Sequence, residues 1–148
     1  HFWGADGSLA ELLILPGGGT LYPASEDTVK NKLHYLSMKG NEVFKHAVKR
    51  MGEAALEALK QAGIEKEQVD YLIPHQANLR IIDATGERLN LPKEKIVANI
   101  HKYGNMSVAT IPVALHELAE AGKLQKGQII VMVAFGAGFT WASAVYRW

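Results

Sequence analysis

The sequence contains no cysteine. This absence excludes disulfide bonds, thiolate metal sites and a cysteine nucleophile supplied by these residues, and it fits a cytoplasmic protein. No apolar run approaches the roughly 18 residues that a membrane-spanning helix needs, and the chain does not open with a signal-peptide pattern. The formal net charge is only +1, so no overall field favours nucleic acid or a membrane surface. Recognition of a charged partner must therefore depend on local patches.

The length of 148 residues predicts one domain over 1–148, which buries roughly 70% of the surface of its unfolded form. Hydrophobic residues make up 48% of the sequence, which is enough for one folded core. The segment His1–Gly4 has no initiator methionine and leads at once into strand-like sequence. We therefore interpret the first residue as a break within a longer polypeptide.

Apolar residues recur with both helical and strand periods along the chain. The longest helical pattern ends at Gly63, and Asn41 is its expected N-cap. The next helix is expected to bury Leu79, Ile82 and Leu89. The sequence predicts helices over 41–62, 78–89 and 107–121, a helical turn over 26–32, and strands over 10–15, 69–74, 96–100, 128–134 and 140–146.

Strands that alternate with helices predict an α/β domain in which helices cover a mixed sheet. Ligands in such domains gather where strands end and helices begin. Two polar segments occupy junctions of this kind, Pro74–Asn78 and Tyr103–Ser107. These junctions are the expected location of the functional site.

His75 and Asn105 are the polar residues in these junctions that best fit a chemical role. A neutral imidazole and a carboxamide can each present an N–H group to a ligand. Two such donors that converge on one oxygen would form an oxyanion hole. The structural alternatives are that His75 is an ordinary cap or surface group and that Asn105 caps the helix that follows.

Other segments carry weaker signals. The turn Phe135–Trp141 contains small residues that let a backbone N–H approach a ligand, but a plain hairpin explains it equally well. The basic residues Lys45, Arg80 and Arg88 fit either a docking patch or a solvated helix face. No histidine spacing predicts a metal site, and no Gly-x-Ser-x-Gly elbow predicts a serine hydrolase.

Taken together, four segments carry a more specific signal than any one of them. Their order and spacing resemble the C-terminal half of the β-ketoacyl-acyl-carrier-protein synthase III family, whose members start dissociated fatty-acid synthesis. The resemblance covers the chain from about Gly4 to its end. The four segments are Met38–Lys45, Ile73–Arg80, Tyr103–Pro112 and Phe135–Trp141.

The resemblance implies a thiolase-like layered fold built from two similar α/β halves, and a Cys-His-Asn catalytic set. The cysteine belongs to the N-terminal half, which is absent here, while His75 and Asn105 match the histidine and the asparagine. An acyl group, expected to be acetyl, would pass from coenzyme A to that cysteine, with one backbone N–H of the oxyanion site at Ala137. Malonyl-acyl-carrier protein would then lose carbon dioxide, and side-chain N–H groups of His75 and Asn105 would stabilise the enolate oxygen.

The same resemblance assigns further positions. It implies no separate cofactor, because the coenzyme A thioester is a substrate. It also implies no metal. Glu87 stands where some members have a lysine and is expected to weaken the basic patch. Ala137 replaces a family glycine, which matters little if only its backbone acts. Expected carrier-protein contacts are Lys45, Arg80 and Arg88. Expected substrate contacts are Gly40, Phe44, Ala77 and Asn78 along a pantetheine tunnel and Phe135 beside the nucleophile.

The expected partners are the missing N-terminal half, acyl-carrier protein and acyl-CoA, with a homodimer as the complete assembly and the isolated chain inactive. Two alternatives stay open at this point. Relatives with the same catalytic set make polyketide starters, quinolone precursors or hydroxymethylglutaryl-coenzyme A. A second alternative is a non-catalytic module that binds carrier protein or coenzyme A without turnover.

Overall fold

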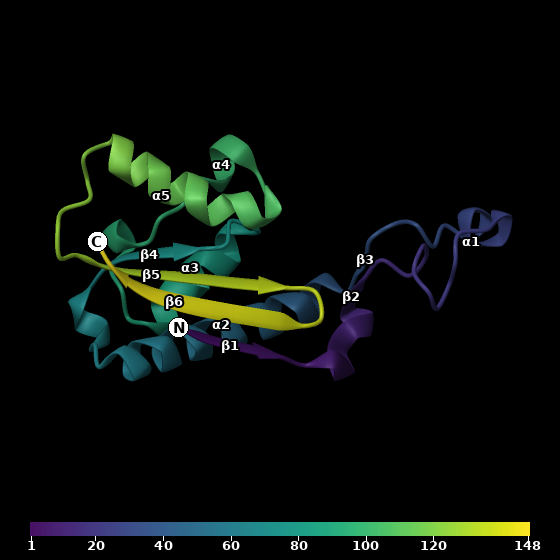
Figure 1. Ribbon diagram of the computed structural model, residues 1–148, viewed down its shortest axis with the longest axis horizontal. Coiled ribbons are helices and arrows are strands. Elements are labelled where there is room, and N and C mark those ends of the chain that lie inside the picture. The colour runs from purple at the N-terminus through teal and green to yellow at the C-terminus, as the bar shows by residue number, and fades with distance from the viewer.

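A four-stranded mixed sheet forms the centre of the fold in the computed structural model, which describes residues 1–148 (Figure 1). The spatial order of its strands is β1-β6-β5-β4, in which β4 and β5 are parallel and the other neighbours are antiparallel. The strands are β1 Phe2–Ala5, β4 Val69–Pro74, β5 Ile129–Gly136 and β6 Thr140–Arg147.

Helices cover both faces of this sheet (Figure 1). Helices α2 Gly40–Ala62 and α3 Leu79–Arg88 lie on one face, and α4 Ile100–Tyr103 and α5 Thr110–Glu120 lie on the other. Successive residues of a strand point to opposite faces, so β5 serves both cores. Val131 packs with the α2 and α3 side chains, whereas Ile130 packs with Leu118 of α5.

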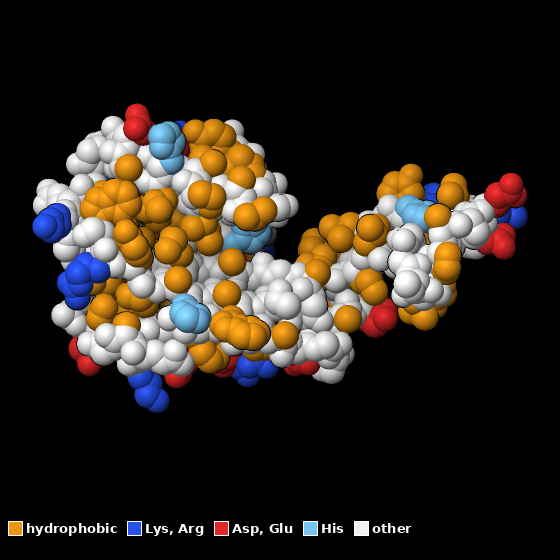
Figure 2. All heavy atoms as spheres, viewed as in Figure 1, with side chains coloured by type: hydrophobic (Ala, Val, Ile, Leu, Met, Phe, Trp, Pro, Cys, Tyr) orange, Lys and Arg blue, Asp and Glu red, His pale blue; other side chains and the backbone are white.

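An arm of residues 13–38 projects from this layered body (Figure 1). Its base is a short antiparallel ladder between β2 Leu13–Ile14 and β3 Ser37–Met38, and its far end carries α1 Glu26–Lys30. Figure 2 shows hydrophobic side chains along the arm. The most exposed of them include Leu21 at 79% and Tyr35 at 70%. The arm therefore presents apolar surface that the chain itself does not bury.

The main sequence predictions are confirmed. Strand β4 has the predicted bounds, Gly63 caps the C-terminal end of α2 with φ +64°, and β5 and β6 form the predicted hairpin. Asn78 caps α3 by accepting a hydrogen bond from the backbone N–H of Arg80, at 2.9 Å. Short 3₁₀ helices complete the chain at Gly7–Leu12, Lys66–Gln68, Lys93–Lys95 and Ser107–Ala109. No helix is both long and apolar enough to cross a membrane.

Two strand predictions were wrong for most of their length. In the predicted strand over 10–15 only Leu13–Ile14 form a strand, β2, and residues 10–12 belong to the 3₁₀ helix Gly7–Leu12. The Asp6 carboxylate accepts the Ser8 N–H and caps that helix. The predicted strand over 96–100 is only an isolated bridge between Ile96 and Leu72. The N–H groups of Asn99 and Ile100 donate to a side chain instead of to a neighbouring strand.

Two predictions about helix residues were also wrong. Asn41 is not the N-cap of α2, because the helix begins one residue earlier and Lys39 occupies the cap position without a side-chain hydrogen bond. Leu79 does not face the core but is 50% exposed in the first turn of α3. Ile81, with Ile82, takes the buried face that was expected for Leu79.

Candidate active site

His75 follows β4 directly and is held by contacts from two other elements. Its backbone N–H donates to the carbonyl oxygen of Val133 on the parallel strand β5, at 2.8 Å. Its ring atom Nδ1 lies 2.7 Å from the hydroxyl oxygen of Thr110, the first residue of α5. The ring is half-buried, and burial lowers the pKa of His75 below its ordinary value. His75 is therefore neutral near pH 7, and no hydrogen bond within the chain occupies its Nε2 atom.

Gln76 fixes the loop that carries His75. This side chain is completely buried, and its amide uses both of its polar atoms. Nε2 donates to the carbonyl oxygens of Pro74 and Val97 at 2.8 and 3.1 Å. Oε1 accepts from the backbone N–H groups of Asn99 and Ile100 at 2.9 and 3.2 Å. Gln76 therefore joins the end of β4 to the segment that leads into α4.

Asn105 lies just beyond α4, in a loop that Gly104 opens with φ +68°. The Asn105 side chain accepts the backbone N–H of Ser107 at Oδ1, at 3.0 Å. This bond resembles the capping role that was the structural alternative for Asn105, but it uses only the oxygen of the amide. The Nδ2 group is exposed and donates to no atom of the chain, so it is free to donate to a ligand.

A series of three hydrogen bonds connects His75 with Asn105. It runs from His75 to the Thr110 hydroxyl, from that hydroxyl to the Ser107 carbonyl at 3.0 Å, and from the Ser107 N–H to Asn105. Thr110 is 1% exposed, so the centre of the series is shielded from water. The structure therefore brings the two predicted donors into one bonded unit at the start of α5.

Glu117 holds the other side of this unit. Its carboxylate accepts from Lys102 at 2.8 Å, from Asn99 at 2.8 Å and from the Tyr103 hydroxyl at 2.9 Å. These bonds, from Lys102 first, lower the pKa of Glu117 to about 2. The bonded carboxylate ties α4 to α5 and so restrains the loop that carries Asn105.

The β5–β6 hairpin extends the same edge of the sheet. The ring of Phe139 is completely buried and lies 4.8 Å from the Phe135 ring and 5.5 Å from the His46 ring of α2, measured between centroids. Thr140 braces the turn by donating to the Ala137 carbonyl at 3.1 Å. No hydrogen bond within the chain uses the N–H of Ala137. That N–H group is available to an external acceptor, as the predicted role requires.

The remaining predicted residues lie on α2 and at the start of α3. The Arg80 guanidinium lies over the Phe44 ring, 4.8 Å from its centre, and this contact joins the first turn of α3 to the N-terminal part of α2. Gly40 begins α2, and Ala77 and Asn78 precede α3. These positions therefore share one end of the helical layer.

Among the three residues of the predicted basic patch, only Lys45 forms an ion pair within the chain. Lys45 pairs with Glu42 at 3.0 Å, and Arg88 lies close along α2 at Gly52, where an added Cβ would meet Arg88 Cδ at 2.6 Å. No ion pair joins Glu87 to Arg80, so the predicted weakening of the patch has no direct contact behind it.

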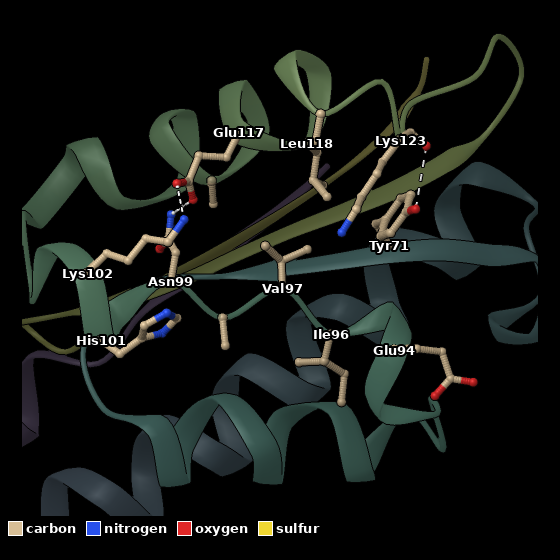
Figure 3. A pocket seen from close by; sticks show the side chains of 13 residues that line it. Tyr71, Glu94, Ile96, Val97, Asn99, His101, Lys102, Glu117, Leu118 and Lys123 are labelled. Atoms are coloured by element: carbon tan, nitrogen blue, oxygen red, sulfur yellow. Dashed lines mark hydrogen bonds and ion pairs between the residues drawn. The ribbon is translucent and has the colours of Figure 1, made fainter.

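A cavity lies elsewhere, between β4, the segment before α4, and α5 (Figure 3). Its volume is about 530 Å³, and its lining includes Tyr71, Asn99, Lys102 and Lys123. None of the predicted catalytic or substrate residues lines it. No group of three or more His, Asp or Glu side chains could hold a metal ion.

Sequence reasoning did not identify Gln76, Thr110 and Glu117 as parts of this site. Gln76 and Thr110 stand within the quoted motif segments, which was the available signal. Their partners lie 21 to 35 residues away along the chain, at Val97 and His75. Local spacing cannot reveal such long-range bonds.

Comparison with known proteins adds the family context. A model of the family "3-Oxoacyl-[acyl-carrier-protein (ACP)] synthase III C terminal" matches residues 59–148. Beta-ketoacyl-[acyl-carrier-protein] synthase III of Desulfitobacterium hafniense is 54% identical to the chain over 145 residues, covering 98% of the chain and 44% of the relative. The homologue of Caldanaerobacter subterraneus is 50% identical over 147 residues, covering 99% of the chain and 44% of the relative.

Solved structures agree with these matches. The synthase III structure from Thermus thermophilus has a TM-score of 0.85 and 44% identity, covering 99% of the chain and 44% of that structure. The synthase III structure from Aquifex aeolicus has a TM-score of 0.83 and 46% identity, covering 99% of the chain and 43% of that structure. The predicted thiolase-like α/β fold is confirmed by these likenesses. The chain spans less than half the length of the curated relatives it matches.

Proposed function

The chain belongs to the 3-oxoacyl-[acyl-carrier-protein] synthase III C-terminal family, and we propose that it is the C-terminal catalytic part of a β-ketoacyl-acyl-carrier-protein synthase III. The proposed reaction is the condensation of an acyl-CoA, expected to be acetyl-CoA, with malonyl-acyl-carrier protein. The nucleophilic cysteine comes from the N-terminal part of the full-length enzyme, since this chain contains none.

The bonded series from His75 to Asn105 is the observation that carries this proposal. It holds two side chains at the end of β4 and the start of α5 while leaving His75 Nε2 and Asn105 Nδ2 without partners. Both groups are proposed to donate to the thioester oxygen when malonyl decarboxylation places negative charge there. One such donor in a dry site contributes ~3 kcal/mol to lowering the barrier.

The other proposed roles follow the geometry of the hairpin and helices. The free N–H of Ala137 is assigned to the oxyanion that forms when the cysteine is acylated. Phe135 is assigned to the wall beside the nucleophile. The shared helical end is assigned to the pantetheine arm through Gly40, Phe44, Ala77 and Asn78. Carrier protein is proposed to dock on Lys45, Arg80 and Arg88.

Turnover by the full-length enzyme tests this function. Acetyl-CoA and malonyl-acyl-carrier protein are supplied, and acetoacetyl-acyl-carrier protein is detected by mass spectrometry. We expect product from the full-length enzyme and none from the 148-residue chain alone. Absence of product with every acyl-CoA of a panel would contradict the proposal. Product from the chain alone would contradict the role of a cysteine from elsewhere.

A further inference from the structure

Helix α4 has only four residues, and a single helical turn is not stable without contacts from outside. Two side chains supply these contacts. Gln76, which follows His75, accepts the two backbone N–H groups where α4 begins. Glu117 of α5 accepts from the side chains of Lys102 and Tyr103 at 2.8 and 2.9 Å. The position of α4 is therefore set by the end of β4 and by α5.

The amide of Asn99, the residue before α4, is turned towards Glu117 (Figure 3). Its Nδ2 donates to the Glu117 carboxylate at 2.8 Å. Its Oδ1 is buried and accepts no hydrogen bond from the chain, although an unpaired buried acceptor is costly. The opposite orientation of the amide would place Oδ1 against a carboxylate oxygen, and neither of these atoms can donate. The carboxylate therefore fixes the side chain of Asn99 as well as the two donors on α4.

Asn105 depends on α4 for its direction. Its own side chain makes one bond within the chain, from the backbone N–H of Ser107 to Oδ1. The Gly104 N–H donates to the Ile100 carbonyl at 2.8 Å, and this bond attaches the start of the loop to α4. A rotation of α4 would therefore carry Asn105 with it and change the direction in which Nδ2 points.

Two residues of α5 anchor the loop that carries Asn105, one on each side of it. Beyond Asn105, the Thr110 hydroxyl donates to the Ser107 carbonyl at 3.0 Å. Before Asn105, Glu117 holds α4. Residues 110 and 117 are two helical turns apart, so they share one face of α5 and lie about 10 Å apart along its axis. The helix thereby fixes both ends of the segment that presents Asn105 Nδ2.

We propose that Glu117 is a positioning residue that acts through its bonds to α4 and Asn99 to aim Asn105 Nδ2 at the enolate oxygen. This inference rests on the proposed function and names a residue that sets the geometry of its second donor. Such a donor must lie about 2.7–3.1 Å from the oxygen on which charge develops. A misplacement of about 1 Å can lower the rate by about 10²-fold. Glu117 makes no contact with the substrate in this assignment, so its effect passes through Asn105.

The rates of the two half-reactions in the full-length enzyme test this proposal. Cysteine acylation by acetyl-CoA does not use Asn105, whereas malonyl-acyl-carrier-protein decarboxylation does. We expect Glu117→Gln, which weakens the acceptor, to slow decarboxylation about tenfold and to leave acylation unchanged. Tyr103→Phe removes one donor and should slow decarboxylation about fivefold, the factor that corresponds to one hydrogen bond.

The ratio of the decarboxylation rate to the acylation rate separates positioning from a loss of folded protein, which would lower both rates equally. An unchanged ratio in either variant would overturn the proposal. Faster decarboxylation in Glu117→Gln would also overturn it, because the carboxylate would then act by its charge.

Tyr71→Phe is the matched control for Tyr103→Phe. The Tyr71 hydroxyl also donates to the α5 side of the cavity, at the Lys123 carbonyl 3.5 Å away, but Tyr71 has no bond to α4. We expect the wild-type ratio in this variant. A ratio lowered as far as in Tyr103→Phe would show that any loosening around α5 is sufficient, and it would overturn the assignment to Glu117.

A double-mutant cycle tests whether the effect of Glu117 passes through Asn105. Glu117→Gln should cause no further slowing of decarboxylation in the Asn105→Ala background, because the donor that it aims is already absent. A further tenfold slowing in that background would overturn the proposal. Slow decarboxylation in Asn105→Ala together with a wild-type rate in Glu117→Gln contradicts this inference alone. A wild-type rate in Asn105→Ala contradicts the proposed function, and the inference with it.

Discussion

The guanidinium of Arg80 lies 4.8 Å from the centre of the Phe44 ring and so joins the first turn of α3 to α2. The stacked ring steadies an exposed cation that would otherwise sample many positions. The contact also places one predicted carrier-protein residue directly on one predicted tunnel residue. A carrier protein that docks at Arg80 would therefore bring its pantetheine arm to the end of the helical layer where Phe44 lies.

Replacing Arg80 by alanine in the full-length enzyme should weaken use of malonyl-acyl-carrier protein. We expect kcat/KM to fall by a factor that corresponds to about 1 kcal/mol, mainly because KM rises. We also expect kcat/KM to depend less on salt concentration. Arg147→Ala on β6 is the matched control and should leave both quantities unchanged. Equal kcat/KM values for Arg80→Ala and Arg147→Ala across a salt series would contradict the proposed docking role.

Replacing Gln76 by methionine should destabilise the fold although it preserves side-chain volume. The change removes four hydrogen bonds, which the Gln76 amide makes to backbone groups of Pro74, Val97, Asn99 and Ile100. We expect the free energy of unfolding to fall by about 3 kcal/mol, measured by urea denaturation. Gln61→Met, which changes an exposed glutamine on α2, should stay within about 0.5 kcal/mol of the wild type. A Gln76→Met loss as small as that of the control would show that the amide does not support the loop.

These bonds also show why some of the fold could be predicted and some could not. Strand β4 was predicted with its observed bounds because a short apolar run between polar segments is a local signal. The segment after Ile96 was mistaken for a strand because it is also apolar. Its N–H groups at Asn99 and Ile100 are satisfied by Gln76, which lies more than twenty residues earlier. Local periodicity does not reveal that competition for backbone hydrogen bonds.

The candidate site was predictable to a similar extent. His75 and Asn105 were identified because strand–helix junctions and a family resemblance both pointed to them. The Thr110 bond that orients His75 spans 35 residues and depends on how α5 packs against the end of β4. That bond could not be derived from the residue types alone.

Glu117 should make stability depend on pH in the acid range. Its bonds to Lys102, Asn99 and Tyr103 lower its pKa from 4.5 to about 2 in the folded state. This contribution to stability is present above pH 4.5 and is lost as the pH falls towards 2, because the unfolded chain takes up the proton first. Urea unfolding at several pH values should show Glu117→Gln less stable than the wild type at pH 7, with a smaller difference at pH 3. Glu120→Gln, which changes the last residue of α5, is the control and should show no such trend. If the stability difference between Glu117→Gln and the wild type were the same at every pH, the bonds to the Glu117 carboxylate would not contribute as proposed.

The apolar arm should cause the isolated chain to associate, either with the N-terminal half of the enzyme or with itself. Exposed side chains such as Leu36 at 69% and Tyr35 at 70% favour contacts that exclude water. Light scattering should report species larger than a monomer, and replacing Leu36 and Tyr35 by serine should reduce them. Leu56→Ser, at an exposed position of α2, is the control and should not. A clean monomer of the unpaired wild-type chain would argue against this role of the arm.

The most direct test of the account separates the two stages of the reaction in the full-length enzyme. His75→Ala and Asn105→Ala are compared with His116→Ala, which changes an exposed histidine on α5. Mass spectrometry follows acylation of the cysteine by acetyl-CoA, and release of carbon dioxide follows decarboxylation of malonyl-acyl-carrier protein. We predict that each of the first two changes slows decarboxylation by about 10²- to 10³-fold while acylation continues and His116→Ala behaves as wild type. Decarboxylation at the wild-type rate in His75→Ala and Asn105→Ala would contradict the central claim that these two side chains stabilise the enolate.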